Sequence, residues 1–345
     1  MGAVRDMIDW TLRARRIVPH EDRKVLLSPV RLVARFSRFA LRRHGGRAGR
    51  ASDDDVRARD PELVSLLLDL YRLAGEHYFR LRIEGVEHVP ASGPVLLVGN
   101  HNGGLLPTDS FFTALAIHDR YGPDRAMYAL AHDFLFDDPL LRSYAARLGM
   151  LRAGHESARH AFAAGGCVLV YPGSDLETFR PFRDRHKIVL GGRKGFLALA
   201  LREGVPIVPV VTAGTHEQII VLTRGERLAR LVHAHAWART EVMPLMLALP
   251  WGLTSGFVPY LPLPAQTSLA FGEPMTWPDL GPEDADRPEA LARCYAEVES
   301  RMQEMLDRLS KGRRFLLGQR QNRTYPAAAI CTHHEPEGSR TKDEP

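Results

Sequence analysis

The sequence predicts an α/β domain in which a mostly parallel sheet is flanked by helices. Short apolar runs with the length of buried strands, most of them ending at Gly or Pro, occur at YFRLRIEG, PVLLVGN, AMYALAH, GCVLVYPG and VPIVPVV. Helical patterns lie between them at 110–118, 155–164 and 195–202. This alternation of strand and helix is typical of parallel βαβ units with both sheet faces covered. Ligands of such sheets bind at the carboxyl ends of the strands.

The composition is that of a globular chain with a sizeable core. Of its 345 residues, 45% are hydrophobic and 25% are charged. The three cysteines, Cys167, Cys294 and Cys331, are far apart and in no paired spacing. The spacing argues against a disulfide framework and a zinc ribbon and favours a reducing compartment. We recognise no secretory signal, because charged residues interrupt the first apolar positions.

Residues 1–77 are expected to form a basic helical arm that associates with membranes. Residues 1–50 hold thirteen Lys or Arg and four Asp or Glu, a net charge of +9, whereas the whole chain carries +5. Val30, Val33 and Phe36 recur at helical spacing, with arginines largely on the other faces. Basic amphipathic helices of this kind lie on anionic lipid, which we favour over nucleic acid as the partner. The same pattern also suits a helix packed on the main domain.

The remaining boundaries follow from changes of pattern. Helices are expected at 22–43 and 61–76, ahead of a main domain at 78–317. A strand at TSLAFGEP and an amphipathic helix at 284–310 close this domain. The polar tail at 318–345 is expected to be disordered.

The segment 242–272 contains no charged residue. Its length would suit a membrane span, but prolines and glycines break every helix before it could cross. We therefore expect an apolar segment that is re-entrant or lies on the surface and holds an acyl chain. The alternative is a proline-rich loop that crosses the core.

A first polar loop follows the apolar run PVLLVG. It contains Asn100, His101, Gly103, Gly104 and Asp109, and an apolar helix is expected to begin just after it. A histidine with an ordinary pKa of about 6.5 can remove a proton from an alcohol near neutral pH. It does so better when a carboxylate holds its second ring nitrogen. Asp109 is the nearest acid in the sequence, although it would also suit the cap of the helix.

A second set of polar residues follows the run GCVLVYPG. Gly173 lies in a Pro-Gly turn whose backbone amides could hold an anion or a developing oxyanion. Glu177 and Arg180 come next, and the arginine could bind a phosphate or carboxylate through two hydrogen bonds. Arg193 and Lys194 precede a predicted helix, at the kind of terminus where anions bind. Each of these cations could also be an ordinary surface charge.

The ordered set of three motifs resembles the phospholipid/glycerol acyltransferase family, of the lysophosphatidic acid acyltransferase type. Its Asn-His-x-x-x-x-Asp, Phe-Pro-Glu-Gly-Thr-Arg and Val-Pro-Ile-Val-Pro motifs correspond to NHNGGLLPTD, YPGSDLETFR and VPIVPV. The resemblance covers roughly residues 78–275. Two departures stand out. His101 and Asp109 lie eight apart rather than five, with Leu106 at the usual aspartate position. The Pro-Gly-x-x-x-Glu form is similar to the diacylglycerol acyltransferase branch.

The resemblance implies transfer of a fatty acyl group from acyl-CoA or acyl carrier protein, used as a co-substrate, to a lipid hydroxyl. His101 would be the general base and Asp109 its partner, with no metal and no other cofactor. The acceptor would be a lysophospholipid or glycerol phosphate lipid, or alternatively a neutral acylglycerol or other lipid alcohol. The other loop residues would bind the substrates: Asn100, Gly103, Gly104, Gly173, Glu177, Arg180, Arg193 and Lys194. The protein would lie at the cytoplasmic face of the membrane, as a peripheral or monotopic protein.

Three other classes of function fit the sequence less well. A serine hydrolase would use Ser174, but Pro172 and Leu176 occupy the glycine positions of a nucleophile elbow. A non-enzymatic lipid-binding protein would account for the basic arm and the uncharged segment, yet not for the His101 loop. A nucleotide-binding module is disfavoured, because GGRKGF lacks the phosphate-binding pattern of a P-loop.

Overall fold

In the computed structural model, the described residues are 55–101, 106–137, 139–234, 240–256, 258 and 260–319. The predicted helix at 22–43, the two loop glycines Gly103 and Gly104, and all but the first residues of the predicted tail lie outside them.

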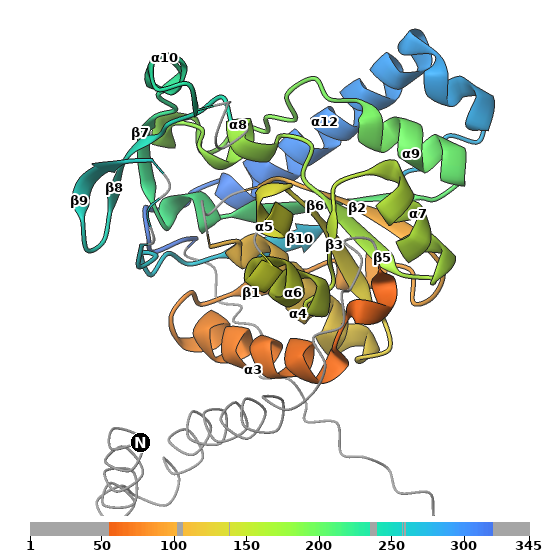
Figure 1. Ribbon diagram of the computed structural model, residues 1–345, viewed down its shortest axis with the longest axis horizontal. Helices are drawn as coiled ribbons and strands as arrows, with labels where there is room; N and C mark the ends of the chain where they lie inside the picture. Colours follow the sequence, from red (N-terminus) through yellow and green to blue (C-terminus); the bar gives the residue numbers. More distant parts are fainter. Residues whose placement is uncertain are drawn as a thin grey trace, which may run out of the picture.

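A seven-stranded sheet forms the centre of the molecule, in the order β1-β10-β6-β2-β5-β3-β4 (Figure 1). Its strands are β1 (Arg82–Glu84), β2 (Val95–Gly99), β3 (Met127–Ala131), β4 (Met150–Arg152), β5 (Cys167–Val170), β6 (Ile207–Ala213) and β10 (Ser268–Phe271). The pairs β6–β2, β2–β5, β5–β3 and β3–β4 are parallel, whereas β10 runs antiparallel to β6. The predicted fold class, a mostly parallel sheet flanked by helices, is therefore confirmed.

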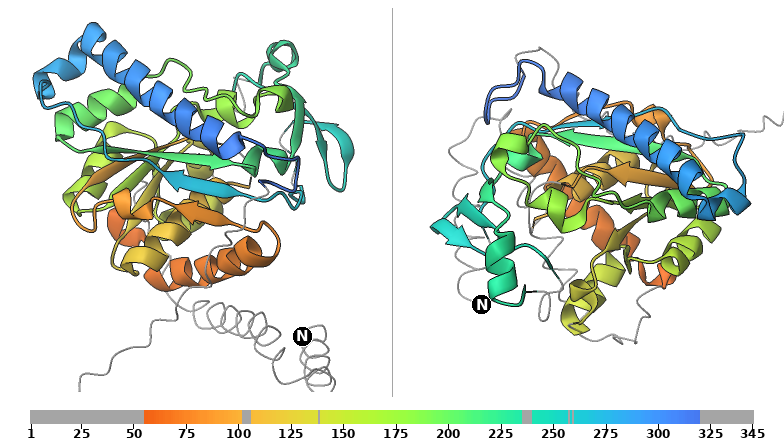
Figure 2. Two further views of the ribbon diagram at one scale, coloured as in Figure 1. Left: turned by 180° about the vertical axis from the view of Figure 1, so that it is seen from behind. Right: turned by 90° about the horizontal axis from the view of Figure 1, so that it is seen from above.

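Helices cover both faces of this sheet (Figure 2). They are α3 (Pro61–His77), α4 (Thr108–Tyr121), α5 (Phe134–Asp137), α6 (Pro139–Arg147), α7 (His155–Ala163), α8 (Ser174–Thr178), α9 (Gly195–Glu203), α10 (Glu226–Leu231) and α12 (Pro288–Ser310). Short 3-10 turns occur at Val56–Ala58, Val86–His88, Phe182–Asp184, Thr215–Glu217 and Pro282–Asp286. The helix expected at 284–310 begins at Pro288 because the preceding residues form the last of these turns.

The alternation of side chains along β2 divides the core into two layers. Val95 and Leu97 face α3 and α4, in a cluster that includes Phe112. Leu96 and Val98 face α7, α9 and α12 on the other side. All four β2 side chains are completely buried, as expected for a central strand covered on both faces.

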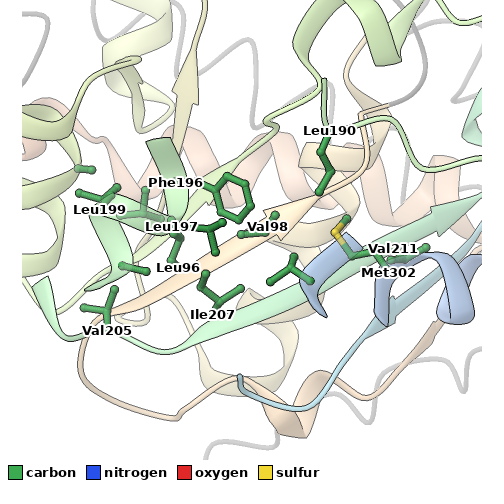
Figure 3. Close-up of a cluster of buried hydrophobic side chains, with 14 of the residues drawn as sticks. Leu96, Val98, Leu190, Phe196, Leu197, Leu199, Val205, Ile207, Val211 and Met302 are labelled. Atoms are coloured by element: carbon green, nitrogen blue, oxygen red, sulfur yellow. The ribbon is translucent and has the colours of Figure 1, made fainter. Parts of the chain in front are cut away.

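Figure 3 shows the second layer in detail. Phe196 and Leu197 of α9 and Met302 of α12 pack over Leu96 and Ile207, which lie on the adjacent strands β2 and β6. This packing fixes the sheet from which the polar loops emerge. On the opposite face, α3 packs against α4, so the helix predicted at 61–76 contributes to the core of the main domain.

A second sheet accounts for much of the uncharged segment 242–272. It consists of β7 (Ile220–Thr223), β8 (Leu245–Ala248) and β9 (Gly252–Ser255), in that order and antiparallel. The first described part of the segment is a hairpin at one end of the molecule, and the last part is β10 of the main sheet (Figure 1). The hairpin lies at the surface, as one of the expected forms does, and the described residues of the segment do not form a proline-rich loop through the core. No helix among the described residues is long and apolar enough to cross a membrane.

Candidate active site

Three neighbouring strands of the main sheet bring the polar loops together. The central strand β2 lies between β5 and β6 and is parallel to both, so their carboxyl ends meet at one edge. His101 follows β2 and Tyr171 follows β5 directly. The site therefore lies at the carboxyl ends of parallel strands, where the sequence predicted it.

His101 and Asp109 form a hydrogen-bonded pair. The Nδ1 atom of His101 lies 2.9 Å from Oδ2 of Asp109. The aspartate is buried, with 1% of its side chain exposed, whereas 21% of the histidine side chain is exposed. Asp109 is the second residue of α4 and accepts the Ser110 N–H at 2.8 Å. The cap position of this helix belongs to Pro107, so the cap interpretation of Asp109 is wrong.

The surroundings of His101 make it a stronger base than a free histidine. Burial by itself would lower the pKa of the imidazole. The Asp109 carboxylate outweighs this effect through its charge and its hydrogen bond, and Glu177 adds to it, so the pKa of His101 is raised above 6.5. A proton taken up by the ring is therefore stabilised by the buried partner.

Tyr171 stacks on the catalytic candidate, a contact that the sequence analysis did not foresee. The ring centroids of His101 and Tyr171 are 4.3 Å apart, and the planes are inclined by 18°. The Tyr171 hydroxyl accepts a hydrogen bond from Ser110 Oγ at 3.0 Å. Gly99 makes room for this ring, because a Cβ atom there would lie 2.4 Å from Tyr171 Cε1. An aromatic residue directly after a buried strand was the signal available in the sequence.

Glu177 joins the His101 loop to the chain after α8. Its carboxylate is completely buried and accepts the backbone N–H of His101 at 2.8 Å and of Val189 at 3.0 Å. Burial raises the pKa of Glu177, while Arg180 and these two hydrogen bonds act in the opposite direction. Glu177 therefore holds the His101 backbone in place, and both of its carboxylate oxygens are engaged with the protein.

Gly173 allows the second loop to pack closely. A Cβ atom at this position would lie 2.1 Å from the Val189 carbonyl oxygen and 2.5 Å from Glu177 Cβ. The residue is buried, with a φ of −65°, so the need for glycine here is one of space and not of conformation. This differs from the expected exposed amide that would hold an oxyanion.

The side chain of Asn100 forms hydrogen bonds with the protein backbone. Asn100 is 1% exposed, and its side chain forms two hydrogen bonds to the Thr212 backbone: Nδ2 donates to the carbonyl at 3.0 Å, and Oδ1 accepts the N–H at 2.7 Å. These bonds join the ends of β2 and β6. The expectation that Asn100 binds substrate does not match this position, because its amide pairs with a strand end instead.

Arg180 likewise points into the protein. Its side chain is completely buried, and its Nη atoms donate to the carbonyls of Glu177 at 3.0 Å and Arg185 at 3.4 Å. Burial lowers the pKa of this guanidinium, while Glu177 raises it. The backbone carbonyl of Arg180 lies 2.7 Å from Nε2 of His216. A phosphate cannot reach Arg180 in this arrangement, in contrast to the expected phosphate contact.

Arg193 and Lys194 lie nearer the surface. The side chain of Arg193 is 48% exposed and donates to the Pro172 carbonyl at 2.9 Å, and Asp175 lies 3.8 Å away. This contact brings Arg193 next to the Pro-Gly turn of the second motif. Lys194 precedes the first turn of α9 and is partly exposed. These two cations are placed where an anionic group could approach.

Two other kinds of site can be compared with this geometry. Ser174 follows the strand β5 and has a φ of 48°, but within the described part of the chain no hydrogen bond joins it to His101. A serine nucleophile needs such a base within reach. No three His, Cys, Asp or Glu side chains in the described ranges gather closely enough to hold a metal ion.

Comparison with known proteins places the chain in a family. Residues 80–213 match the family model described as Acyltransferase. An uncharacterized protein of Mycobacterium tuberculosis is 34% identical over 256 residues, which are 74% of this chain and 69% of the relative. This chain belongs to the acyltransferase family. An uncharacterized protein of Mycobacterium leprae is 32% identical to this acyltransferase over 74% of the chain and 67% of its own length.

More distant relatives carry descriptive names. A chicken protein named "DGAT1/2-independent enzyme synthesizing storage lipids" is 27% identical over 53% of this acyltransferase and 52% of its own length. The crystal structure of the 1-acyl-sn-glycerophosphate (LPA) acyltransferase PlsC from Thermotoga maritima is similar with a TM-score of 0.40 and 18% identity, over 74% of this chain and 86% of that one. By its family, the protein is an acyltransferase.

Proposed function

We propose that this acyltransferase transfers a fatty acyl group from acyl-CoA or acyl carrier protein to a lipid hydroxyl, with His101 as general base. The observation that carries the proposal is the 2.9 Å contact between His101 Nδ1 and the buried Asp109. Since Asp109 engages Nδ1, the other ring nitrogen, Nε2, is left to take the proton of the acceptor hydroxyl.

The steps of the reaction follow from this assignment. Nε2 of His101 removes the hydroxyl proton as the acceptor oxygen attacks the thioester carbonyl. The new C–O bond forms a tetrahedral intermediate, and the C–S bond then breaks. The imidazolium returns its proton to the departing thiolate, which regenerates the base. Asp109 stabilises the imidazolium between these two transfers.

We propose a neutral acylglycerol as the acceptor, in preference to a lysophospholipid. A buried phosphate needs cationic partners, yet Arg180 is buried and donates to protein carbonyls. The Pro-Gly-x-x-x-Glu form of the second motif supports the same choice. So do relatives in chicken, cattle and human whose name is "DGAT1/2-independent enzyme synthesizing storage lipids".

A lysophospholipid or glycerol phosphate lipid is the second candidate acceptor. The observation that favours it is the exposed position of Arg193 and Lys194 beside the Pro172 turn. With a neutral acceptor, these two cations would be available for the phosphates of acyl-CoA.

The basic arm supports a peripheral or monotopic position at the cytoplasmic face of the membrane. Each basic residue near an anionic surface contributes about 1 kcal/mol, and residues 1–50 carry a net +9. The protein should sediment with membranes, and deletion of residues 1–50 should release part of it. A full-length protein found entirely in the soluble fraction at low salt would contradict this assignment.

The direct test of the reaction is to incubate the purified protein with a panel of acceptors and a labelled fatty acyl group, carried as a thioester on CoA or on acyl carrier protein. Lipid extraction then shows which acceptor has received the label. We expect labelled product with a monoacylglycerol or diacylglycerol. Labelled product with lysophosphatidic acid alone would support the second candidate acceptor. Release of free fatty acid alone, together with labelling by a serine-directed fluorophosphonate, would support the hydrolase instead.

A further inference from the structure

The outer face of the small sheet is apolar and exposed. Register pairs Leu247 of β8 with Leu253 of β9 and with Ile220 of β7, so these side chains share one face. Leu247 is 41% exposed and Leu253 is 62% exposed. Leu222, at the register shift of β7 between Val221 and Thr223, is also exposed. Exposed apolar patches of this kind mark interaction surfaces.

The turns that flank this sheet extend the apolar face. Trp251, at the tip of the hairpin between β8 and β9, is 59% exposed. Leu249 and Leu261 form an isolated backbone bridge next to it, and both side chains are exposed. Tryptophan at the tip of an apolar loop suits the boundary between water and lipid, because the ring is apolar with one polar N–H.

The neighbouring helix α10 lies at the same end of the molecule as the small sheet (Figures 1 and 2). Its arginines add positive charge there. Ala229 is the buried residue of this helix, so the side chains on the other side of the helix point outward. Leu228 and Leu231 share one part of the exposed surface, and Leu231 is 76% exposed. Arg227 and Arg230, also exposed, share the part beside it. Leucine beside arginine matches a bilayer with anionic head groups, whereas a neutral protein partner would not need the two cations.

The inner face of the small sheet packs against residues that contact the loops of the active site. Val221 and Met246 pack in one cluster with Phe179, which directly follows α8. Tyr260 belongs to the same cluster, and it is hydrogen-bonded to the backbone of Leu106, in the loop between His101 and Asp109. A lipid bilayer in contact with the outer face of the small sheet would therefore lie close to His101 and Asp109.

We infer that the outer face of β7–β9, together with the exposed side of α10, inserts into the head-group region of an anionic lipid bilayer and presents the active site to lipid acceptors. This inference deepens the proposed function and rests on it for the role of the surface, whereas the insertion itself can be measured without any turnover.

Vesicle binding of the full-length protein tests the insertion. The variant Leu247→Gln/Leu253→Gln should bind phosphatidylcholine vesicles containing phosphatidylglycerol about ten- to a hundredfold more weakly for each leucine removed. High salt is used so that the charges of the basic arm are screened. The matched control is Leu70→Gln, which removes a leucine of α3 that is 47% exposed, outside this surface. Equal binding by the wild-type protein, Leu247→Gln/Leu253→Gln and Leu70→Gln would overturn the inference.

A second measurement needs no change to the leucines. Lipids brominated in their acyl chains quench a tryptophan that enters the bilayer, so part of the quenching in the wild-type protein should disappear in Trp251→Phe. Unchanged quenching would contradict insertion of the tip. Concentration-dependent dimers that form without vesicles and are abolished by Leu253→Gln would instead make this face an interface between two copies.

The two proposals can fail separately. If the leucine variant loses vesicle binding while no acceptor is acylated by the wild-type protein, the surface stands and the proposed function fails. If acyl transfer is observed and the variant acylates lipid in vesicles as fast as the wild type, the inferred surface fails. Retained activity of the variant on a detergent-dispersed acceptor shows that its active site is intact.

Discussion

The ring of Tyr171 lies face to face with the imidazole of His101, with 4.3 Å between the centroids. The contact restricts the imidazole from the side, while Asp109 holds it at Nδ1. Two separate strands supply the two rings, since His101 follows β2 and Tyr171 follows β5. The orientation of His101, the proposed base, therefore depends on the central pairing of the sheet.

Removal of the Tyr171 ring should lower the rate of acyl transfer. Tyr171→Leu loses the stacking, which contributes about 0.5–1.5 kcal/mol for aromatic pairs, so we expect kcat to fall by up to about tenfold. Tyr171→Phe keeps the ring and loses the hydrogen bond from Ser110, and its kcat should stay closer to that of the wild type. Steady-state kinetics with acyl-CoA distinguish these outcomes, and equal kcat values for both variants would contradict the positioning role.

The pH dependence of the rate should report the His101–Asp109 pair. His101 acts as a base only when it is neutral, and its pKa is raised above 6.5. The rate should therefore increase as the pH rises through this raised pKa. Asp109→Asn removes the charge that stabilises the imidazolium, so the acidic limb should move to lower pH while the maximal rate falls by at least about tenfold. An acidic limb at the same pH in both proteins would separate Asp109 from the base.

Glu177→Gln should destabilise the fold. Glutamine offers one acceptor oxygen, so its NH₂ group would face the N–H of either His101 or Val189. The change also removes the carboxylate that lies 3.7 Å from the buried Arg180. We expect the free energy of unfolding to fall by about 1–3 kcal/mol, measured by urea denaturation. Unchanged stability with a raised KM would instead indicate that Glu177 binds substrate.

Substitution of Arg193 distinguishes the two acceptor classes. If a phosphorylated acceptor binds there, Arg193→Ala should raise its KM about ten- to a hundredfold, because a charge-assisted hydrogen bond contributes about 1.5–3 kcal/mol. The neutral acceptor that we propose should show an unchanged KM. Arg183→Ala is a suitable control, since that side chain is 85% exposed. A large increase in the KM for lysophosphatidic acid, with no turnover of acylglycerol, would contradict the proposed acceptor.

The central strands and the contact between His101 and Asp109 could be predicted from the sequence. Long apolar runs such as VPIVPVV favour burial, and β6, at Ile207–Ala213, begins inside this run and extends two residues past its end. The strands β4, β7, β8 and β9 were missed because they have three or four residues and depend on pairing with distant segments. The uncharged character of 242–272 was recognised correctly, but an apolar composition does not distinguish a hairpin from a loop.

The direction of a side chain was the part of the site that the sequence could not provide. His101 and Asp109 meet as predicted, whereas Asn100 and Arg180 turn inward to pair with backbone groups. At the end of a strand, the side chains of adjacent residues point in opposite directions. Asn100 therefore forms hydrogen bonds with β6, whereas His101 points to Asp109 at the edge of the site. Tyr171 was missed because its partner in the stack lies 70 positions away along the chain.

The rate of acyl transfer by His101→Ala, measured with labelled acyl-CoA and the best acceptor of the panel, tests the central claim most directly. The account predicts a loss of about 10²- to 10⁴-fold, the usual contribution of a general base, in a protein whose thermal unfolding shows that it is folded. A folded His101→Ala protein that keeps most of the wild-type rate with every acceptor would contradict it.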